Sequence, residues 1–372
     1  KRHGLQPGLN PKLYCSRGDM YMLQESMRTS QKWRLGTLLL LGPLIALLLS
    51  SCTPRSPLDE TPIPIGTTEP SMEVPAPVTP PAVPLACGSE TYFAIRKDGT
   101  LIGWGNNENG TLGGSDLHIP VTEPREIMTD IRAVSSGQWV TLMIDKENTL
   151  WGIGMDYFGH LGPDEDKQQP VRLMEDVVMA STSAWHCLAL KGDGSLWCWG
   201  MGRNGVPGVY ELVSQEYTPP EKIMDDVLYA VCYRNGGYAI KADHTLWEWG
   251  VVSSTPEKIL EDVQYVQNCM AILTNGDMVT WTYTEDGERT EPELRLHDVA
   301  CGMTGVAVQT DGTLYVETVS DSGSTYEAVI EDVEYAVTGA EYTLVLKQDG
   351  TLWTWNSAGE GDVSQIMDGI GF

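Results

Sequence analysis

One unit recurs seven times between residues 85 and 372, and this repetition limits the possible folds more than any other feature of the chain. The unit is an apolar strand, a turn and an aromatic strand, and its first copy spans residues 92–104. The later copies span residues 141–153, 187–199, 238–249, 270–281, 306–317 and 343–355. A spacing of about 41 residues is the period of a four-stranded propeller blade. The repetition therefore predicts an all-β, seven-bladed β-propeller over residues 85–372.

Each copy has the chemistry of a β-hairpin. The turn pairs are Asp98-Gly99, Glu147-Asn148, Asp193-Gly194, Asp243-His244, Asn275-Gly276, Asp311-Gly312 and Asp349-Gly350. The second residue of such a turn takes a positive φ, which glycine adopts freely and asparagine tolerates, so His244 is the strained substitute. After the turn, alternation predicts one equivalent apolar position per copy: Leu101, Leu150, Leu196, Leu246, Met278, Leu314 and Leu352.

A second unit, found between the hairpins, ends in an acidic and then a branched residue, as in residues 127–131. The repeated aspartate is typical of a turn that bonds its own backbone, and the alternative is a ring of metal ligands. The repeat region starts at residue 85, partway through a repeat. It ends with residues 366–372, which match the strand that precedes the same part of the repeat in the other copies. We therefore expect the two ends to complete one shared blade, because an open solenoid would leave frayed edges.

These repeats resemble those of the regulator of chromosome condensation family. The resemblance rests on His186, on 188–190 and on Gly194, Leu196, Trp199, Gly200 and 204–205, with 104–107 and 110–113 in copy one. The resemblance implies a seven-bladed propeller. The family's nuclear founder is a small-GTPase exchange factor on chromatin, a role we do not expect here. A similar secreted bacterial branch inhibits β-lactamases through one propeller face.

The residues before the repeats are typical of an export signal. A start at Met27 is followed by basic residues and an uncharged stretch over 35–51. The stretch ends in Leu-Ser-Ser before Cys52, which resembles the lipobox of bacterial lipoproteins and implies lipidation of Cys52. A plain signal peptide or a membrane helix is the alternative. We thus expect 1–51 as upstream and signal segment, 52–84 as lipidated cysteine and linker, and 85–372 as propeller.

The segment after Cys52 is rich in proline, with ten in residues 53–84, which is typical of a semi-rigid spacer. The lipobox and this spacer together predict a domain in the cell envelope, on the outer side of the membrane, with a lipid anchor as its only attachment. The chain carries 24 basic and 51 acidic residues, for a net charge of −27. Such an acidic surface repels phosphate backbones, so nucleic acid is not an expected partner. No motif points to a catalytic site, a metal site or a cofactor.

Partner-binding residues are predicted on loops at one end of the blades. Trp139 and Trp185 occupy the same loop position in adjacent copies, and exposed tryptophans are typical interface anchors. The alternative is that each ring lies against its own blade. The other candidates on this rim, or on the longer loops of the first blades, are Glu90, Arg234, Asn235, Glu341, Tyr342, Tyr157 and Phe158.

The cysteines leave two interpretations open. Cys187 and Cys198 flank one hairpin turn, and they face each other if residue 190 lies opposite residue 195, which would permit a disulfide. A register shift of one residue would leave them as buried thiols.

The sequence favours a surface-tethered module that recognises an extracellular protein or glycan through one face of the ring. The alternatives are a secreted carboxylate-dependent hydrolase and a structural spacer that binds nothing.

Overall fold

The computed structural model describes residues 84–371, except 116, 118, 163–167, 201–218, 235, 251–252, 254, 285, 304, 321–322 and 357–362. These residues belong to one compact unit, Pro75–Phe372. The predicted start at Met27, Cys52 with most of the proline-rich segment, and Asn235 lie outside the described residues. No helix in the described part is long and apolar enough to cross a membrane.

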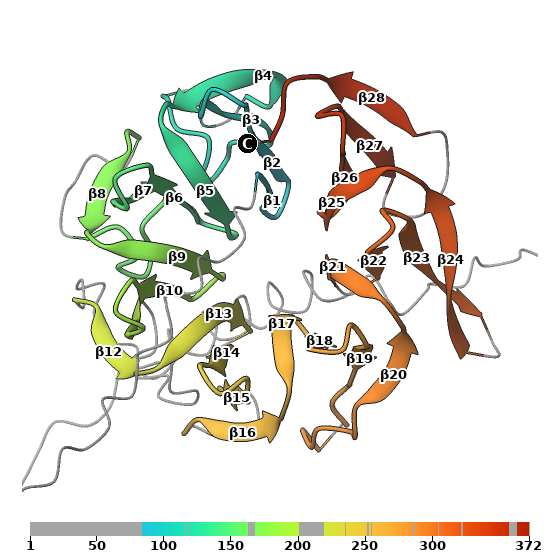
Figure 1. Ribbon diagram of the computed structural model, residues 1–372. Coiled ribbons are helices and arrows are strands. Elements are labelled where there is room, and N and C mark those ends of the chain that lie inside the picture. The colour runs from blue at the N-terminus through green and yellow to red at the C-terminus, as the bar shows by residue number, and fades with distance from the viewer. Residues whose placement is uncertain are drawn as a thin grey trace, which may run out of the picture. The chain divides into compact units, whose positions relative to one another are not determined.

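The described strands form seven four-stranded antiparallel sheets, which we number as blades 1 to 7 in chain order (Figure 1). Blade 1 consists of β1 (Leu85–Cys87), β2 (Thr91–Ile95), β3 (Leu101–Gly105) and β4 (Val121–Met128). Blade 2 consists of β5 (Ile131–Ser136), β6 (Val140–Asp145), β7 (Leu150–Gly154) and β8 (Val171–Met174). Blade 3 consists of β9 (Val177–Thr182), β10 (His186–Lys191), β11 (Leu196–Gly200) and β12 (Glu221–Met224). Blade 4 consists of β13 (Val227–Tyr233), β14 (Gly236–Lys241), β15 (Leu246–Trp249) and β16 (Glu257–Leu260). Blade 5 consists of β17 (Val263–Gln267), β18 (Met270–Leu273), β19 (Met278–Thr280) and β20 (Glu293–Leu296). Blade 6 consists of β21 (Val299–Met303), β22 (Val306–Gln309), β23 (Leu314–Ser320) and β24 (Gly323–Ile330). Blade 7 consists of β25 (Val333–Thr338), β26 (Tyr342–Lys347), β27 (Leu352–Asn356) and β28 (Ser364–Met367). The predicted all-β, seven-bladed propeller is confirmed.

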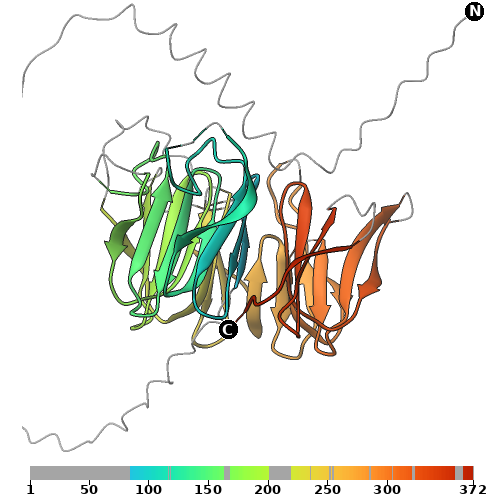
Figure 2. The same ribbon diagram turned by 90° about the horizontal axis from the view of Figure 1, so that it is seen from above.

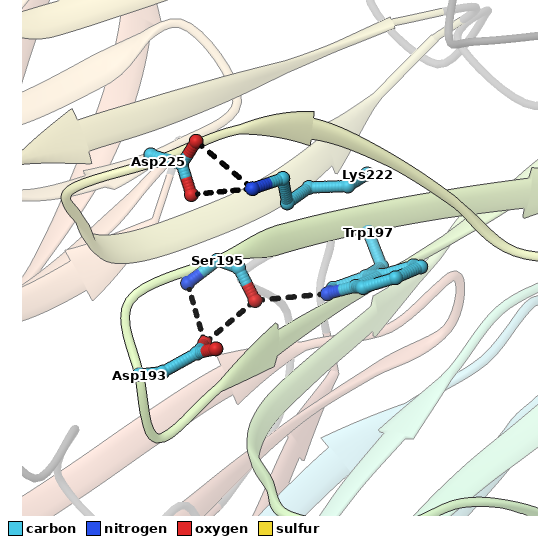
Figure 3. Close-up of polar contacts among 5 residues, drawn as sticks. All are labelled: Asp193, Ser195, Trp197, Lys222 and Asp225. Atoms are coloured by element: carbon cyan, nitrogen blue, oxygen red, sulfur yellow. Dashed lines mark hydrogen bonds and ion pairs between the residues drawn. The ribbon is translucent and has the colours of Figure 1, made fainter.

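The hairpin turns between the second and third strands have the backbone predicted for them. The second turn residue has a positive φ in every copy, including 65° at Asn148 and 62° at His244. In blade 3, the Asp193 carboxylate accepts hydrogen bonds from the Ser195 N–H and hydroxyl, and the hydroxyl accepts one from Trp197 Nε1–H (Figure 3). These bonds lower the pKa of Asp193. The turn polar groups are thus satisfied locally, as they also are beside Trp247 and Trp353.

The core lies between neighbouring blades. The position after each turn is fully buried, at 0% exposure, in all seven copies: Leu101, Leu150, Leu196, Leu246, Met278, Leu314 and Leu352. Leu101 of blade 1 packs with Ile131 and Met143 of blade 2, and Leu352 of blade 7 packs with Leu85 of blade 1. Apolar contact therefore continues across the junction of the two chain ends.

The turns that join one blade to the next contain the repeated aspartate in a left-handed conformation. Its φ is 58° at Asp130, and it lies between 56° and 62° at the five equivalent residues Asp176, Asp226, Asp262, Asp298 and Asp332. Gly369 takes this position in the last copy, with a φ of 73°. The predicted turn role is confirmed, but the Asp130 carboxylate meets Lys146 Nζ at 2.9 Å rather than its own backbone.

The ring closes through an innermost strand that both chain ends build together. Ile370, 1% exposed, forms an antiparallel bridge with Arg96 of blade 1. The next N–H, of Gly371, donates to the Ile95 carbonyl oxygen at 3.0 Å, and the Ile95 N–H donates to the carbonyl oxygen of Pro84 at 2.8 Å. The predicted shared blade is confirmed, with the C-terminal end contributing only the beginning of the strand.

The disulfide between Cys187 and Cys198 does not form. Leu190 lies opposite Leu196 rather than residue 195, so Cys187 lies opposite Trp199 and Cys198 lies opposite Leu188. This one-residue shift places the two thiols on different faces of the sheet, and both are free and buried. The expectation was wrong because the turn contains one residue more than the assumed pairing allowed.

Candidate functional site

Two sets of loops lie at the same end of every blade. Because adjacent strands run in opposite directions, the loop after the first strand and the loop after the third strand are on one side of the sheet. Figure 2 shows the strands from the side, with the connections at their two ends. We call the side with these loops the long-loop face and the side with the hairpin turns the turn face. All the predicted partner-binding residues that the structure describes belong to loops of the long-loop face, or to strand ends beside them.

Four aromatic side chains of blades 2 and 3 meet on the long-loop face. The rings of Trp139 and Tyr157 lie 5.0 Å apart, and those of Phe158 and Trp185 lie 5.3 Å apart. Phe158 also lies 6.4 Å from Trp139, so it bridges the two tryptophans. We call these four residues the aromatic cluster. Both tryptophans are half-buried, and Trp139 also packs against the core between blades 2 and 3, as the alternative interpretation of its ring expected. Tyr157 is 45% exposed, so the cluster presents part of its aromatic surface at a blade junction.

Backbone hydrogen bonds fix the loop that carries Tyr157 and Phe158. The Asp156 carboxylate accepts bonds from the N–H groups of His160 and Leu161. The loop is held to blade 3 because Trp199 Nε1–H donates to the His160 carbonyl oxygen at 2.8 Å. At its start, the Met155 N–H donates to the carbonyl oxygen of Trp139 at 2.9 Å. The aromatic rings are therefore displayed on a supported loop.

Two buried histidines lie beside the aromatic cluster. The His160 ring is 5.8 Å from the Phe158 ring, and His186 follows Trp185 directly. His186 Nδ1 is 3.1 Å from Ser183 Oγ, whereas its Nε2 has no hydrogen-bond partner among the described residues. Burial lowers the pKa of both imidazoles, to about 4 for His186, and the charge on either would also disfavour charge on the other. Both rings are accordingly neutral at neutral pH.

We expect acid to destabilise the protein through His186. Its folded-state pKa of about 4 is below the ordinary 6.5, so the unfolded chain binds a proton that the folded chain does not. The stability is complete above pH 6.5 and is lost as the pH falls towards 4, with a loss of about 2–3 kcal/mol by pH 4.5. Urea unfolding at pH 7.5 and 4.5 measures this difference. His186→Gln should reduce it, and equal pH dependence in wild type and His186→Gln would contradict the assignment.

A polar network occupies the same face on blades 4 and 5. Glu248, with a side chain only 4% exposed, pairs with Arg289 at 2.8 Å and accepts a hydrogen bond from the Tyr283 hydroxyl. The Tyr238 hydroxyl lies 2.8 Å from that of Tyr283. The Arg234 guanidinium lies 5.6 Å from the centre of the Tyr283 ring. Burial and the adjacent Glu248 carboxylate raise the pKa of Tyr283, so this phenol stays protonated and can donate.

Sequence reasoning identified Arg234 but missed the rest of this network. The available signal was Glu248 itself, which occupies a strand position held elsewhere by Gly103, Gly152 or Cys198. A charged residue at a buried strand position requires a partner. Arg289 could not be identified as that partner because it lies 41 residues away, in another blade.

The remaining predicted residues lie on the long-loop face without a described contact to the aromatic cluster. Glu90 is exposed and accepts a hydrogen bond from Asn106 Nδ2 at 2.6 Å. Tyr342 is 41% exposed, and its ring lies 6.0 Å from that of Tyr92, whereas Glu341 is simply exposed. The candidate residues therefore divide between the aromatic cluster and more distant parts of the rim.

The described part of the chain holds no group of three or more His, Cys, Asp or Glu residues that could bind a metal ion. Glu248 is buried, but its oxygens are taken up by Arg289 and Tyr283. What the described geometry offers is contact: aromatic rings at one blade junction and a guanidinium over tyrosine rings at another.

Known proteins share the repeat sequence over part of this chain and share its fold more widely. The family model of the regulator of chromosome condensation repeat matches residues 85–111. The ultraviolet-B receptor UVR8 of Arabidopsis thaliana is 30% identical over 82 residues, which is 21% of this chain and only 18% of the receptor. Prp20p of Saccharomyces cerevisiae, whose crystal structure was described with its binding to Gsp1p and histones, superposes with a TM-score of 0.57 at 16% identity, covering 77% of this chain and 86% of Prp20p. Human WBSCR16 gives a TM-score of 0.48 at 17% identity, covering 76% and 81%.

Proposed function

Because this chain is a member of the regulator of chromosome condensation repeat family, we propose that it is a binding module that recognises a protein through its long-loop face. The observation that carries the proposal is the aromatic cluster, in which Phe158 bridges Trp139 and Trp185 across a blade junction. Tryptophan and tyrosine dominate the energetic centres of protein interfaces because they bury a large area with few rotatable bonds.

The contrast between the two faces supports this choice. On the turn face, polar groups such as those of Asp193, Ser195 and Trp197 bond one another within each hairpin. On the long-loop face, the Tyr157 ring of the aromatic cluster is 45% exposed and lies 5.0 Å from the Trp139 ring. The long-loop face is therefore the better candidate for contact with a partner, because an exposed aromatic ring can bury a large area at an interface.

We further propose that the module is lipid-anchored at Cys52 and acts in the cell envelope on the outer side of the membrane. The support is the basic, apolar, Ser-Ser-Cys order of residues 28–52 and the proline-rich segment that follows. The strong negative charge favours a partner whose contact surface is not itself acidic. Radiolabelled fatty acid should appear on the wild-type protein and be lost in Cys52→Ser; equal labelling of both would exclude this anchor.

Replacing either tryptophan of the aromatic cluster should weaken partner binding. The full chain is immobilised, proteins captured from extracellular and cell-surface extracts are identified, and the affinity of the enriched partner is then measured. We expect Trp139→Ala and Trp185→Ala to cost at least about 2 kcal/mol each, or roughly thirtyfold in Kd. Trp197→Ala is the matched control, because this half-buried tryptophan lies next to a hairpin turn. Retained affinity in both cluster variants, with folding intact, would rule out this surface.

A further inference from the structure

A cavity of about 720 Å³ lies on another part of the molecule, at the seam where blade 7 meets blade 1. Figure 1 shows the outer strands β28 and β4 on either side of this seam. We call this space the closure-seam cavity. Its walls include four largely apolar side chains and its rim includes two cations: Trp104, Pro124, Ile366, Met367, Arg96 and Lys97.

The neighbouring seam, between blades 1 and 2, serves as the internal comparison for this one. At the seam between blades 1 and 2, Lys146 donates its backbone N–H to the Asp130 carbonyl and pairs with the Asp130 carboxylate at 2.9 Å. At the closure seam the corresponding backbone bond joins Lys97 to Gly369. Every other seam has an aspartate at the position of Gly369. Lys97 therefore lacks the carboxylate that its equivalent lysine uses.

Two further changes occur at the same seam. Relative to blade 2, Arg96 takes the position of Asp145, whose carboxylate accepts a hydrogen bond from Trp151 Nε1–H. Blades 3, 4 and 7 also have a cation at this position: Lys191, Lys241 and Lys347. The position of Trp151 is in turn held by the smaller Ile102 in blade 1. The seam thus loses two carboxylates and an indole relative to its neighbour, and it gains a guanidinium.

The charges around the cavity define the kind of ligand it fits. Among the described residues, Arg96 and Lys97 form no ion pair, and both are exposed. The rim also includes three acidic residues, Asp98, Glu123 and Asp368. These three carboxylates outnumber the two cations, so they repel a phosphate or a dicarboxylate more strongly than a ligand with one negative charge. A single carboxylate at the two cations, attached to an apolar body, is compatible with both parts of the lining.

We propose that the closure-seam cavity binds an amphipathic monocarboxylate, independently of any partner on the long-loop face. The carboxylate meets Arg96 and Lys97. The aromatic or alkyl body lies against Trp104 and Met367. This site exists because the closing repeat carries glycine where the other six carry aspartate.

The test measures binding of 4-phenylbutyrate to the full chain by isothermal titration calorimetry, with 4-phenylbutanamide as the uncharged analogue. We expect the carboxylate to bind at least about tenfold more tightly than the amide, and Arg96→Gln to remove this preference. Lys146→Gln is the matched control, because this lysine has the equivalent position at the neighbouring seam and should leave binding unchanged.

Gly369→Asp is the decisive variant, since it restores the missing carboxylate without deleting any side chain. Aspartate is tolerated with a φ of 56° to 62° in the other six copies, and no atom lies within 4 Å of a Cβ placed at Gly369. The variant should fold like the wild type and bind 4-phenylbutyrate about tenfold less tightly, because the introduced carboxylate would pair with Lys97. No binding to the wild type at millimolar ligand, equal binding of acid and amide, or unchanged binding in the Gly369→Asp variant would each overturn the proposal.

Discussion

Replacing Ile370 with aspartate is expected to lower the free energy of unfolding by about 4–5 kcal/mol, a large share of the stability of an ordinary domain. Ile370 is 1% exposed and packs with Leu85, Ile102 and Leu352 from both sides of the closure seam. The substitution removes this apolar contact and places a charge among buried apolar side chains. Because the residue also begins the strand that joins the two chain ends, the loss should affect the whole ring.

Urea unfolding followed by tryptophan fluorescence measures this effect. Val329→Asp is the matched control: it introduces the same charge at a branched residue that is 41% exposed on an outer strand, and it should cost less than about 1 kcal/mol. Similar losses in the two variants would show that the seam contributes little, and the closed ring would then be stabilised by the other blade contacts alone.

Replacing Arg289 with methionine is expected to cost about 3–4 kcal/mol, because it leaves the Glu248 carboxylate buried without its cation. The Glu248 side chain is 4% exposed, so water cannot replace the guanidinium, and the Tyr283 hydroxyl remains its one described hydrogen-bond donor. Methionine keeps most of the apolar length of arginine, so lost packing contributes little to the change.

A double-mutant cycle isolates the ion pair. Glu248→Gln combined with Arg289→Met should recover more than half of the stability lost in Arg289→Met alone, because the uncompensated charge is removed. Arg172→Met, which breaks an exposed ion pair with Glu175, should cost less than about 0.5 kcal/mol. Additive losses in the double variant would mean that Glu248 and Arg289 stabilise the fold independently.

The fold could be predicted because the residues of each repeat favour the same local conformation, a β-hairpin with a tight turn. Turn pairs such as Asp98-Gly99 require a positive φ at one defined position, and the structure has it even at His244, where the residue is unfavourable. Sevenfold recurrence turns a weak local signal into a strong one. The closure was predictable for the same reason: residues 366–372 match a unit whose continuation is found only at the start of the ring.

The site was predictable only in part, because contacts between blades do not follow from the repeat. The equivalent loop positions of Trp139 and Trp185 indicated that both would lie on one face. Their connection through Phe158 depends on the path of a longer loop, which the repeat pattern does not specify. The disulfide failed for a similar reason, since a register shift of one residue separates Cys187 from Cys198 and the turn sequence alone does not set that register.

In the proposed function, the partner contacts the long-loop face of blades 2 and 3. Hydrogen–deuterium exchange of the full chain, alone and saturated with the captured protein, tests it most directly. We predict slower exchange at residues 137–139, 155–161 and 184–186, which carry and support the aromatic cluster. Protection confined to the hairpin turns at 97–99, 146–148 and 192–194, with the cluster loops unchanged, would place the partner on the turn face instead.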